Sequence, residues 1–79
     1  MDFNNFLNIV KDQFFDEDQP NVTAENPFRK LNTYDSLTGM AIIASLEDEY
    51  KVSIPVDDYK KLATVNELYE YVKNKAKGE

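Results

Sequence analysis

The tripeptide Asp35-Ser36-Leu37 is the stretch whose residue types and position are best suited to chemistry. It begins an apolar periodic segment that predicts a helix over Ser36–Tyr50. Asp35 is a good N-cap, because its carboxylate can accept hydrogen bonds from the free amides of the first turn. Ser36 would then lie at the positive end of the helix dipole, where a phosphate group is favoured. Ser36 is therefore suited to carry a phosphodiester, although a plain helix cap explains the same residues.

The composition excludes several kinds of site, because the chain contains no His and no Cys. A serine hydrolase would lack its general base, and thioester chemistry would need a thiol brought in from outside. The acids Asp16 and Asp18 invite comparison with a calcium loop. That pattern fails, since Pro20 stands where a ligand belongs, no Gly follows and no Glu comes at the required distance. We expect no catalytic residue, no metal site and a solvated acidic turn over residues 16–20.

Length and charge bound the class of protein. A chain of 79 residues predicts one small domain over residues 1–79 with a modest core. The net charge of −6 disfavours nucleic acid and anionic membranes as partners and favours basic protein surfaces. No apolar run is long enough to span a membrane, and no signal peptide is visible. We expect a cytoplasmic monomer.

The first part of the chain predicts one helix followed by a long loop. The helix is expected over residues 2–15, capped by Asp2. Its apolar stripe has three- and four-residue spacing and consists of Phe3, Phe6, Leu7, Val10 and Phe14. Residues 21–34 show no long periodic stretch. They predict a loop held to the core by Val22, Phe28 and Leu31.

The helix over Ser36–Tyr50 is expected to bury a single apolar stripe. The predicted members of this stripe are Leu37, Met40, Ile43, Leu46 and Tyr50. Gly39 is unusual there, since Gly costs about 1 kcal/mol relative to Ala inside a helix. Two explanations are equally open. Gly39 clears space for a docking enzyme or an attached group, or it is simply tolerated near the helix start.

Two more helices complete the expected fold. A short one lies over residues 54–62, where Pro55, Asp57 and Asp58 suit a first turn. Thr64 and Glu67 have capping-box spacing and begin a last helix that runs to residue 75. The prediction is an all-α protein. It is a small four-helix bundle with three longer helices, one short helix and a long loop between the first two.

Three segments together resemble the acyl carrier protein family, over residues 28–75. They are Asp35-Ser36-Leu37, Leu46-Glu47-Asp48-Glu49-Tyr50 and Ile54-Pro55. The resemblance implies that Ser36 carries 4'-phosphopantetheine, attached from coenzyme A by a magnesium-dependent phosphopantetheinyl transferase. It also implies that the chain carries acyl groups as thioesters between separate enzymes and is not itself an enzyme.

The sequence departs from the family's pattern on both sides of Ser36. The family often has Leu-Gly-x before Asp-Ser, whereas this chain has Asn32-Thr33-Tyr34, with the leucine displaced to Leu31. The missing Gly implies a different backbone entry to the helix. Fatty-acid-synthesis members commonly carry further acids just after the serine, where this chain has Thr38 and Ala41. The less acidic and more apolar start of the helix favours a carrier dedicated to a specialised pathway.

Acidic residues of the same helix predict a docking surface. The resemblance implies a face for acyl-transferring or acyl-activating enzymes with basic surfaces, steered by charge and weakened by salt. A merely solvated face is the alternative. The predicted docking residues are Asp35, Leu37, Met40, Glu47, Asp48 and Glu49. Leu37 and Met40 are thus placed both in this surface and in the buried stripe.

The cargo is the least determined property. Acyl chains in the family can lie between the helices, and the residues expected to line such a space are Met40, Ile43, Leu46, Ile54, Tyr59, Leu62 and Leu68. The bulk of Tyr59 favours short cargo, although ordinary core packing explains the same residues. Three functions remain open. They are an acyl carrier for fatty-acid, polyketide-like or specialised synthesis, an aminoacyl, peptidyl or D-alanyl carrier loaded by an adenylating ligase, and a helical interaction module.

Overall fold

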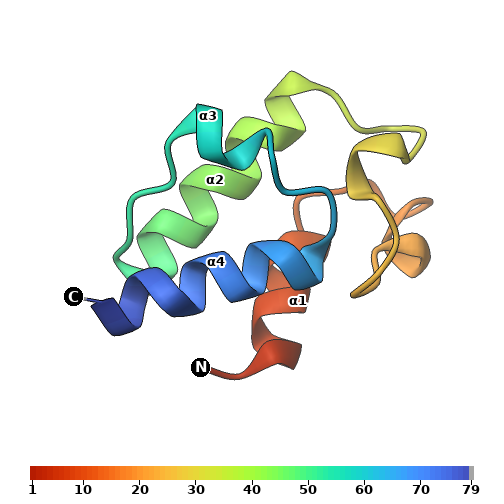
Figure 1. The fold of residues 1–79 in the computed structure, drawn as a ribbon. Helices are drawn as coiled ribbons and strands as arrows, with labels where there is room; N and C mark the ends of the chain where they lie inside the picture. The colour runs from red at the N-terminus through yellow and green to blue at the C-terminus, as the bar shows by residue number, and fades with distance from the viewer. Residues whose placement is uncertain (79) are drawn as a thin grey trace.

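The computed structural model describes residues 1–78, and the side chains of residues 1–76. The elements follow in the order α1 (Phe3–Lys11), η1 (Gln19–Asn21), η2 (Phe28–Lys30), α2 (Ser36–Tyr50), α3 (Val56–Tyr59) and α4 (Val65–Gly78), where η marks a short 3-10 turn. α1 packs against α2 and α4, and the connection between α1 and α2 forms one end of the molecule (Figure 1). The predicted all-α fold, with three longer helices, one short helix and a long loop, is confirmed.

The core is built from apolar side chains of every helix and of the long loop. Its buried members are Phe6, Val10, Phe14, Val22, Phe28, Ile42, Leu46, Ile54, Tyr59, Val65, Leu68 and Val72. Phe6 stacks on Tyr50 of α2 and meets Tyr69 of α4 edge to face. The aromatic stripe of the first helix is therefore what joins three helices. Within the described residues, no helix is both long and apolar enough to cross a membrane.

The first helix is shorter than predicted. The Asp2 carboxylate accepts a hydrogen bond from the Asn4 amide, as expected of an N-cap, but α1 ends at Lys11 and not near residue 15. The next amides, those of Gln13 and Phe14, donate to carbonyls three residues back, which tightens the chain into a turn. This turn still buries Phe14 in the core.

The acidic turn after α1 is not uniformly solvated. Asp16 and Glu17 are exposed as expected, but Asp18 is only 3% exposed. The Asp18 carboxylate accepts hydrogen bonds from the Thr33 amide, at 2.7 Å, and from the Thr33 hydroxyl. A buried carboxylate needs such partners, because an unpaired one would be very costly. Asp18 thereby anchors the segment that leads into α2.

The predicted buried stripe of α2 is partly wrong. Leu37 is 73% exposed and Met40 is 65% exposed, whereas Gly39, Ile42 and Leu46 are buried. Ile43 and Tyr50 are half-buried. Side chains three and four residues apart share one face of a helix, so a buried face through Gly39, Ile42 and Leu46 turns Leu37 and Met40 outward. The prediction missed this face because Gly39 has no apolar side chain to mark it.

Gly39 is buried because two tyrosines cover it. The hydroxyls of Tyr34 and Tyr59 lie 2.9 Å apart, directly beside Gly39. A Cβ atom on Gly39 would clash with the Tyr34 hydroxyl and lie 3.3 Å from the Tyr59 hydroxyl. The space beside Gly39 is therefore filled by the chain itself. Neither a cleared space for a partner nor simple tolerance describes it.

The region of α3 and the start of α4 agrees with the sequence in its caps. The Glu67 amide donates to the Thr64 hydroxyl at 3.2 Å, and the Glu67 carboxylate accepts from the Thr64 amide at 3.3 Å, which confirms the capping box. α3 itself has only four residues, fewer than the predicted segment, and Pro55 is its N-cap. Tyr71 of α4 donates a hydrogen bond of 2.7 Å to Asp58 of α3.

The Gly39→Ala variant should lower the free energy of unfolding, by up to about 2 kcal/mol, because overpacking against Tyr34 outweighs the gain in helix propensity. Urea denaturation measures this, and Ala44→Gly on the exposed side of α2 reports the propensity effect alone. The penalty should disappear in a Tyr34→Ala background. A Gly39→Ala protein more stable than the parent would contradict this account.

The Tyr71 hydroxyl should make stability depend on alkaline pH. Partial burial, together with the hydrogen bond to Asp58, raises the pKa of Tyr71 to about 12. An unfolded tyrosine titrates near about 10. The stabilisation is therefore complete below about pH 10 and is lost as the pH rises towards about 12.

The measurement is urea unfolding of the parent and of Tyr71→Phe across that range of pH. The stability advantage of the parent over the variant should shrink between about pH 10 and about pH 12. Tyr69→Phe, which removes an α4 hydroxyl that donates to the Met1 carbonyl, is the matched control. An advantage that stays constant with pH would refute the assignment.

Candidate functional site

Ser36 is the first residue of α2 and is exposed. The Asp35 carboxylate accepts from the Thr38 amide at 2.9 Å and from the Thr38 hydroxyl at 3.1 Å, so the predicted N-cap is confirmed. These two hydrogen bonds hold the pKa of Asp35 below its usual value. The cap fixes the start of α2 at Ser36. The serine hydroxyl is thus presented on a rigid first turn at the positive end of the dipole.

Ser36 lines one hollow, its neighbours Asp35 and Leu37 line another, and the two hollows differ in charge. The first, of about 350 Å³, lies between α2 and α3 and is lined by Arg29, Tyr34, Ser36, Gly39, Met40, Ile43, Val56, Tyr59 and Lys60. The second, of about 410 Å³, lies between the end of α1 and α2 and is lined by Asp12, Gln13, Phe14, Phe15, Asp35, Leu37, Thr38 and Ala41. The first contains two cationic side chains and the second two carboxylates. A phosphodiester on Ser36 would therefore meet more favourable charge in the first hollow than in the second.

The segment that leads into α2 is positioned by contacts that the sequence did not predict. Asp18 holds Thr33, and the ring of Tyr34 lies between those of Phe14 and Phe28, with centroid distances of 6.2 and 6.1 Å. These contacts stand where the family's Leu-Gly-x would be. The sequence carries no local signal for the pair Asp18 and Thr33, because fifteen residues separate them.

Arg29 is a second residue that the sequence did not single out. Its guanidinium donates to the carbonyls of Tyr59 and Leu62, the latter at 2.6 Å, and lies over the ring of Tyr59 at 4.6 Å. These carbonyls belong to the end of α3 and the turn after it. Arg29 therefore caps α3 and fastens it to η2. The sequence did offer one signal for this role, which is a single arginine next to the loop anchor Phe28 in an acidic chain.

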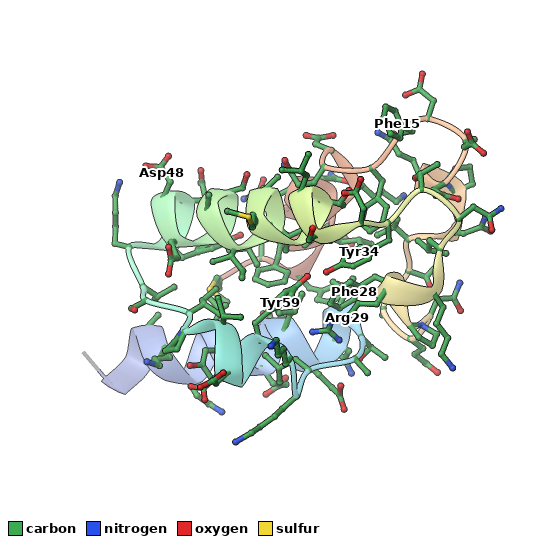
Figure 2. The ribbon with its side chains drawn as sticks, turned by 90° about the horizontal axis from the view of Figure 1, so that it is seen from above. Phe15, Phe28, Arg29, Tyr34, Asp48 and Tyr59 are labelled. Atoms are coloured by element: carbon green, nitrogen blue, oxygen red, sulfur yellow. The ribbon has the colours of Figure 1, made fainter. Side chains whose placement is uncertain are left out.

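The predicted docking residues do not form one surface. Asp35, Leu37, Met40, Asp48 and Glu49 are exposed. Glu47 is half-buried, and its carboxylate accepts from the Ile54 amide at 2.7 Å, so it ties α2 to the link before α3. Glu49 follows Met40 by about two and a half helical turns and lies on the opposite side of α2. Figure 2 shows Asp48 and Phe15 projecting from the same side of the molecule.

The residues expected to line a cargo space are divided between a hollow and the core. Met40, Ile43 and Tyr59 line the hollow beside Ser36. Leu46, Ile54 and Leu68 are instead fully packed in the core, and Leu62 is half-buried. The expected lining is thus only partly correct, because Leu46, Ile54 and Leu68 pack in the core and do not line the hollow. Among the described residues, no cluster of acidic side chains could hold a metal ion.

Comparison with known proteins places this chain in a family. The family model described as phosphopantetheine attachment site matches residues 7–72. An acyl carrier protein of Lactobacillus johnsonii is 32% identical over 72 residues, which are 91% of this chain and 89% of that protein. Acyl carrier proteins of Exiguobacterium and Thermosynechococcus vestitus are each 36% identical, over 75% and 85% of this chain and 75% and 82% of those proteins.

The matched region includes all of α2, α3 and most of α4, as well as the capped serine. The similarity is therefore not confined to a short motif, and it agrees with the helical fold and with the phosphate-compatible position of Ser36. On these grounds the chain belongs to the acyl carrier protein family.

Proposed function

We propose that Ser36 is the residue to which 4'-phosphopantetheine is attached. A member of this family is a carrier and not an enzyme, and phosphopantetheine is its prosthetic group. The observation that supports Ser36 is its exposed hydroxyl on the first turn of a helix capped by Asp35, inside the matched region. A serine in this position is open to a modifying enzyme without any change of fold.

The surroundings of Ser36 fit this group. Its phosphate would lie at a helix N-terminus, with Arg29 and Lys60 in the hollow towards α3 and with Asp35 already engaged by Thr38. The group supplies the thiol that the chain lacks, and acyl cargo is held on that thiol as a thioester. The protein's own part is to present the serine, to keep the first turn rigid and to leave room beside it.

A docking surface for partner enzymes is the second part of the proposal. Leu37 and Met40 on α2, with Val56 on α3, are large apolar side chains that stay exposed beside Ser36. Asp35 and Asp48 add negative charge on the exposed part of α2. Such an apolar centre with an acidic rim suits enzymes with a basic docking surface, the phosphopantetheinyl transferase first among them. The proposed surface does not include Glu47, whose carboxylate accepts from the Ile54 amide. It does not include Glu49 either, because Glu49 lies on the side of α2 opposite Met40.

The proposed class of cargo is supported by the three relatives described above, each of which is named an acyl carrier protein. The proposal is therefore a monomeric cytoplasmic carrier that moves acyl groups between fatty-acid, polyketide-like or other specialised biosynthetic enzymes. An aminoacyl or D-alanyl carrier would instead be charged by an ATP-dependent ligase. These two classes are separated by offering the phosphopantetheine-bearing protein to an acyltransferase and to such a ligase, and by measuring which enzyme forms a thioester on it.

The attachment site is tested by intact mass. After incubation with coenzyme A, magnesium and a broad-specificity phosphopantetheinyl transferase, the protein should gain the mass of one phosphopantetheine. Ser36→Ala should gain nothing, and Ser53→Ala, which removes another exposed serine, should gain as the parent does. Modification of Ser36→Ala would disprove the site. No gain in a folded parent, with an enzyme active on a control carrier, would favour an interaction module.

The docking surface is tested by the kinetics of the same transferase. Leu37→Ala should raise KM more than about fivefold, the effect of losing an apolar anchor worth about 1 kcal/mol. Asp48→Asn should have a smaller effect, under about fivefold, that disappears at high salt. Glu49→Gln on the opposite side of α2 is the matched control. Equal effects of the two acidic substitutions would contradict the proposed surface.

A further inference from the structure

Two tyrosines from opposite sides of the hollow meet between α2 and α3. Tyr34 comes from the segment before α2 and Tyr59 from the end of α3, and their hydroxyl oxygens lie 2.9 Å apart beside Gly39. Figure 2 shows the two side chains pointing toward one another, with Phe28 and Arg29 next to them. We call this pair the tyrosine bridge. It joins two segments that are far apart in the sequence.

Phe28 and Arg29 hold the tyrosine bridge in place. Phe28 packs against both rings, at centroid distances of 6.1 Å to Tyr34 and 6.0 Å to Tyr59. Arg29 lies over the Tyr59 ring and donates to the carbonyls of Tyr59 and Leu62. Tyr59 is accordingly only 4% exposed. Moving Tyr59 aside would disturb an aromatic cluster and a charge-assisted cap together.

The bridge also stands between the hollow and the core. Tyr34, Gly39 and Tyr59 all line the hollow beside Ser36, while Tyr59 is at the same time a member of the buried core. Other members of that core, such as Ile42, Leu46 and Leu68, are fully buried. Gly39 lets the Tyr34 hydroxyl reach its partner, because any Cβ atom there would push it away. The hollow is thus a surface cavity with a closed inner wall.

We propose that the tyrosine bridge closes the interior of the bundle to the cargo, so that a thioester-bound chain stays in the surface hollow whatever its length. This inference rests on the proposed attachment at Ser36. The barrier does not depend on the bulk of Tyr59 alone, because it is formed by Tyr34, Tyr59 and Gly39 together. A short acyl group finds apolar contacts with Met40, Ile43 and Val56, and a long one extends into solvent or into a partner enzyme.

The neutral state of Tyr59 supports a lasting bridge. Burial, and secondarily the hydrogen bond to Tyr34, raises the pKa of Tyr59 well above its usual value. The Tyr59 hydroxyl therefore keeps its proton throughout the neutral range. A cargo chain has only apolar contacts to offer in exchange for the hydroxyl pairing, the aromatic packing and the contacts of Arg29.

The test compares the reactivity of loaded thioesters. Butanoyl and dodecanoyl groups are loaded onto the parent from their coenzyme A thioesters, and cleavage by hydroxylamine is followed by mass. Each rate is divided by that of the same acyl group on free coenzyme A. The two normalised rates should agree within about twofold for the parent, because an acyl chain outside the bundle is not buried. Each buried methylene would shift the equilibrium towards the protected state by about fourfold.

Variants that remove the inner wall should change this result. In Tyr34→Leu and in Tyr59→Leu, dodecanoyl cleavage should slow by more than about tenfold relative to butanoyl, because several methylenes become buried. The dodecanoyl group should also raise the melting temperature of these variants and not that of the parent. Tyr71→Phe, which removes an α4 hydroxyl bonded to Asp58, is the control and should behave as the parent.

Every outcome bears on the proposal. Strong protection of the dodecanoyl thioester in the parent overturns it, even if both leucine variants fail to fold. Folded leucine variants without protection overturn the assignment to these tyrosines. If the transferase does not load Ser36, the attachment proposal fails separately. A dodecyl group can then be joined by a disulfide to Ser36→Cys, the only thiol in the chain, and the melting temperatures are compared in the same way.

Discussion

The contact of Tyr34 and Tyr59 over Gly39 is the constraint on which the site depends. It sets how closely the start of α2 approaches the end of α3, and it lies directly beside the serine at the head of α2. Arg29 extends the contact by capping α3, so a helix of only four residues is held in place. Such a short helix has little stability of its own, and tertiary contacts must supply it.

The charges of the chain divide into structural and exposed groups. Asp18, Glu47 and Glu67 accept backbone hydrogen bonds and hold a loop, a link and a helix start. Asp48 pairs with Lys51 only at 3.9 Å, with both side chains largely exposed, and such a pair adds little stability. The negative net charge of the chain therefore does not by itself predict an acidic docking surface, because several carboxylates are hydrogen-bonded within the fold.

Much of the fold could be predicted because its signals are local. The caps at Asp2, Asp35 and Thr64 depend on neighbours two or three residues away, and each was found as predicted. The outward position of Leu37 and Met40 could not be predicted from apolar periodicity. α2 buries a glycine face, and the atoms that cover that face come from Tyr34 and Tyr59.

The sequence by itself determined the helical class, the caps, the position of Ser36 on a first turn and the absence of any thiol or imidazole, because these follow from residue type and short-range hydrogen bonding. Only the tertiary structure decided that Asp18 is buried, that Leu37 is exposed and that the hollow beside Ser36 has a closed inner wall. Each of these depends on residues far apart in the chain. The burial of Asp18 and the exposure of Leu37 follow from those long-range contacts, which the local pattern of the sequence does not record.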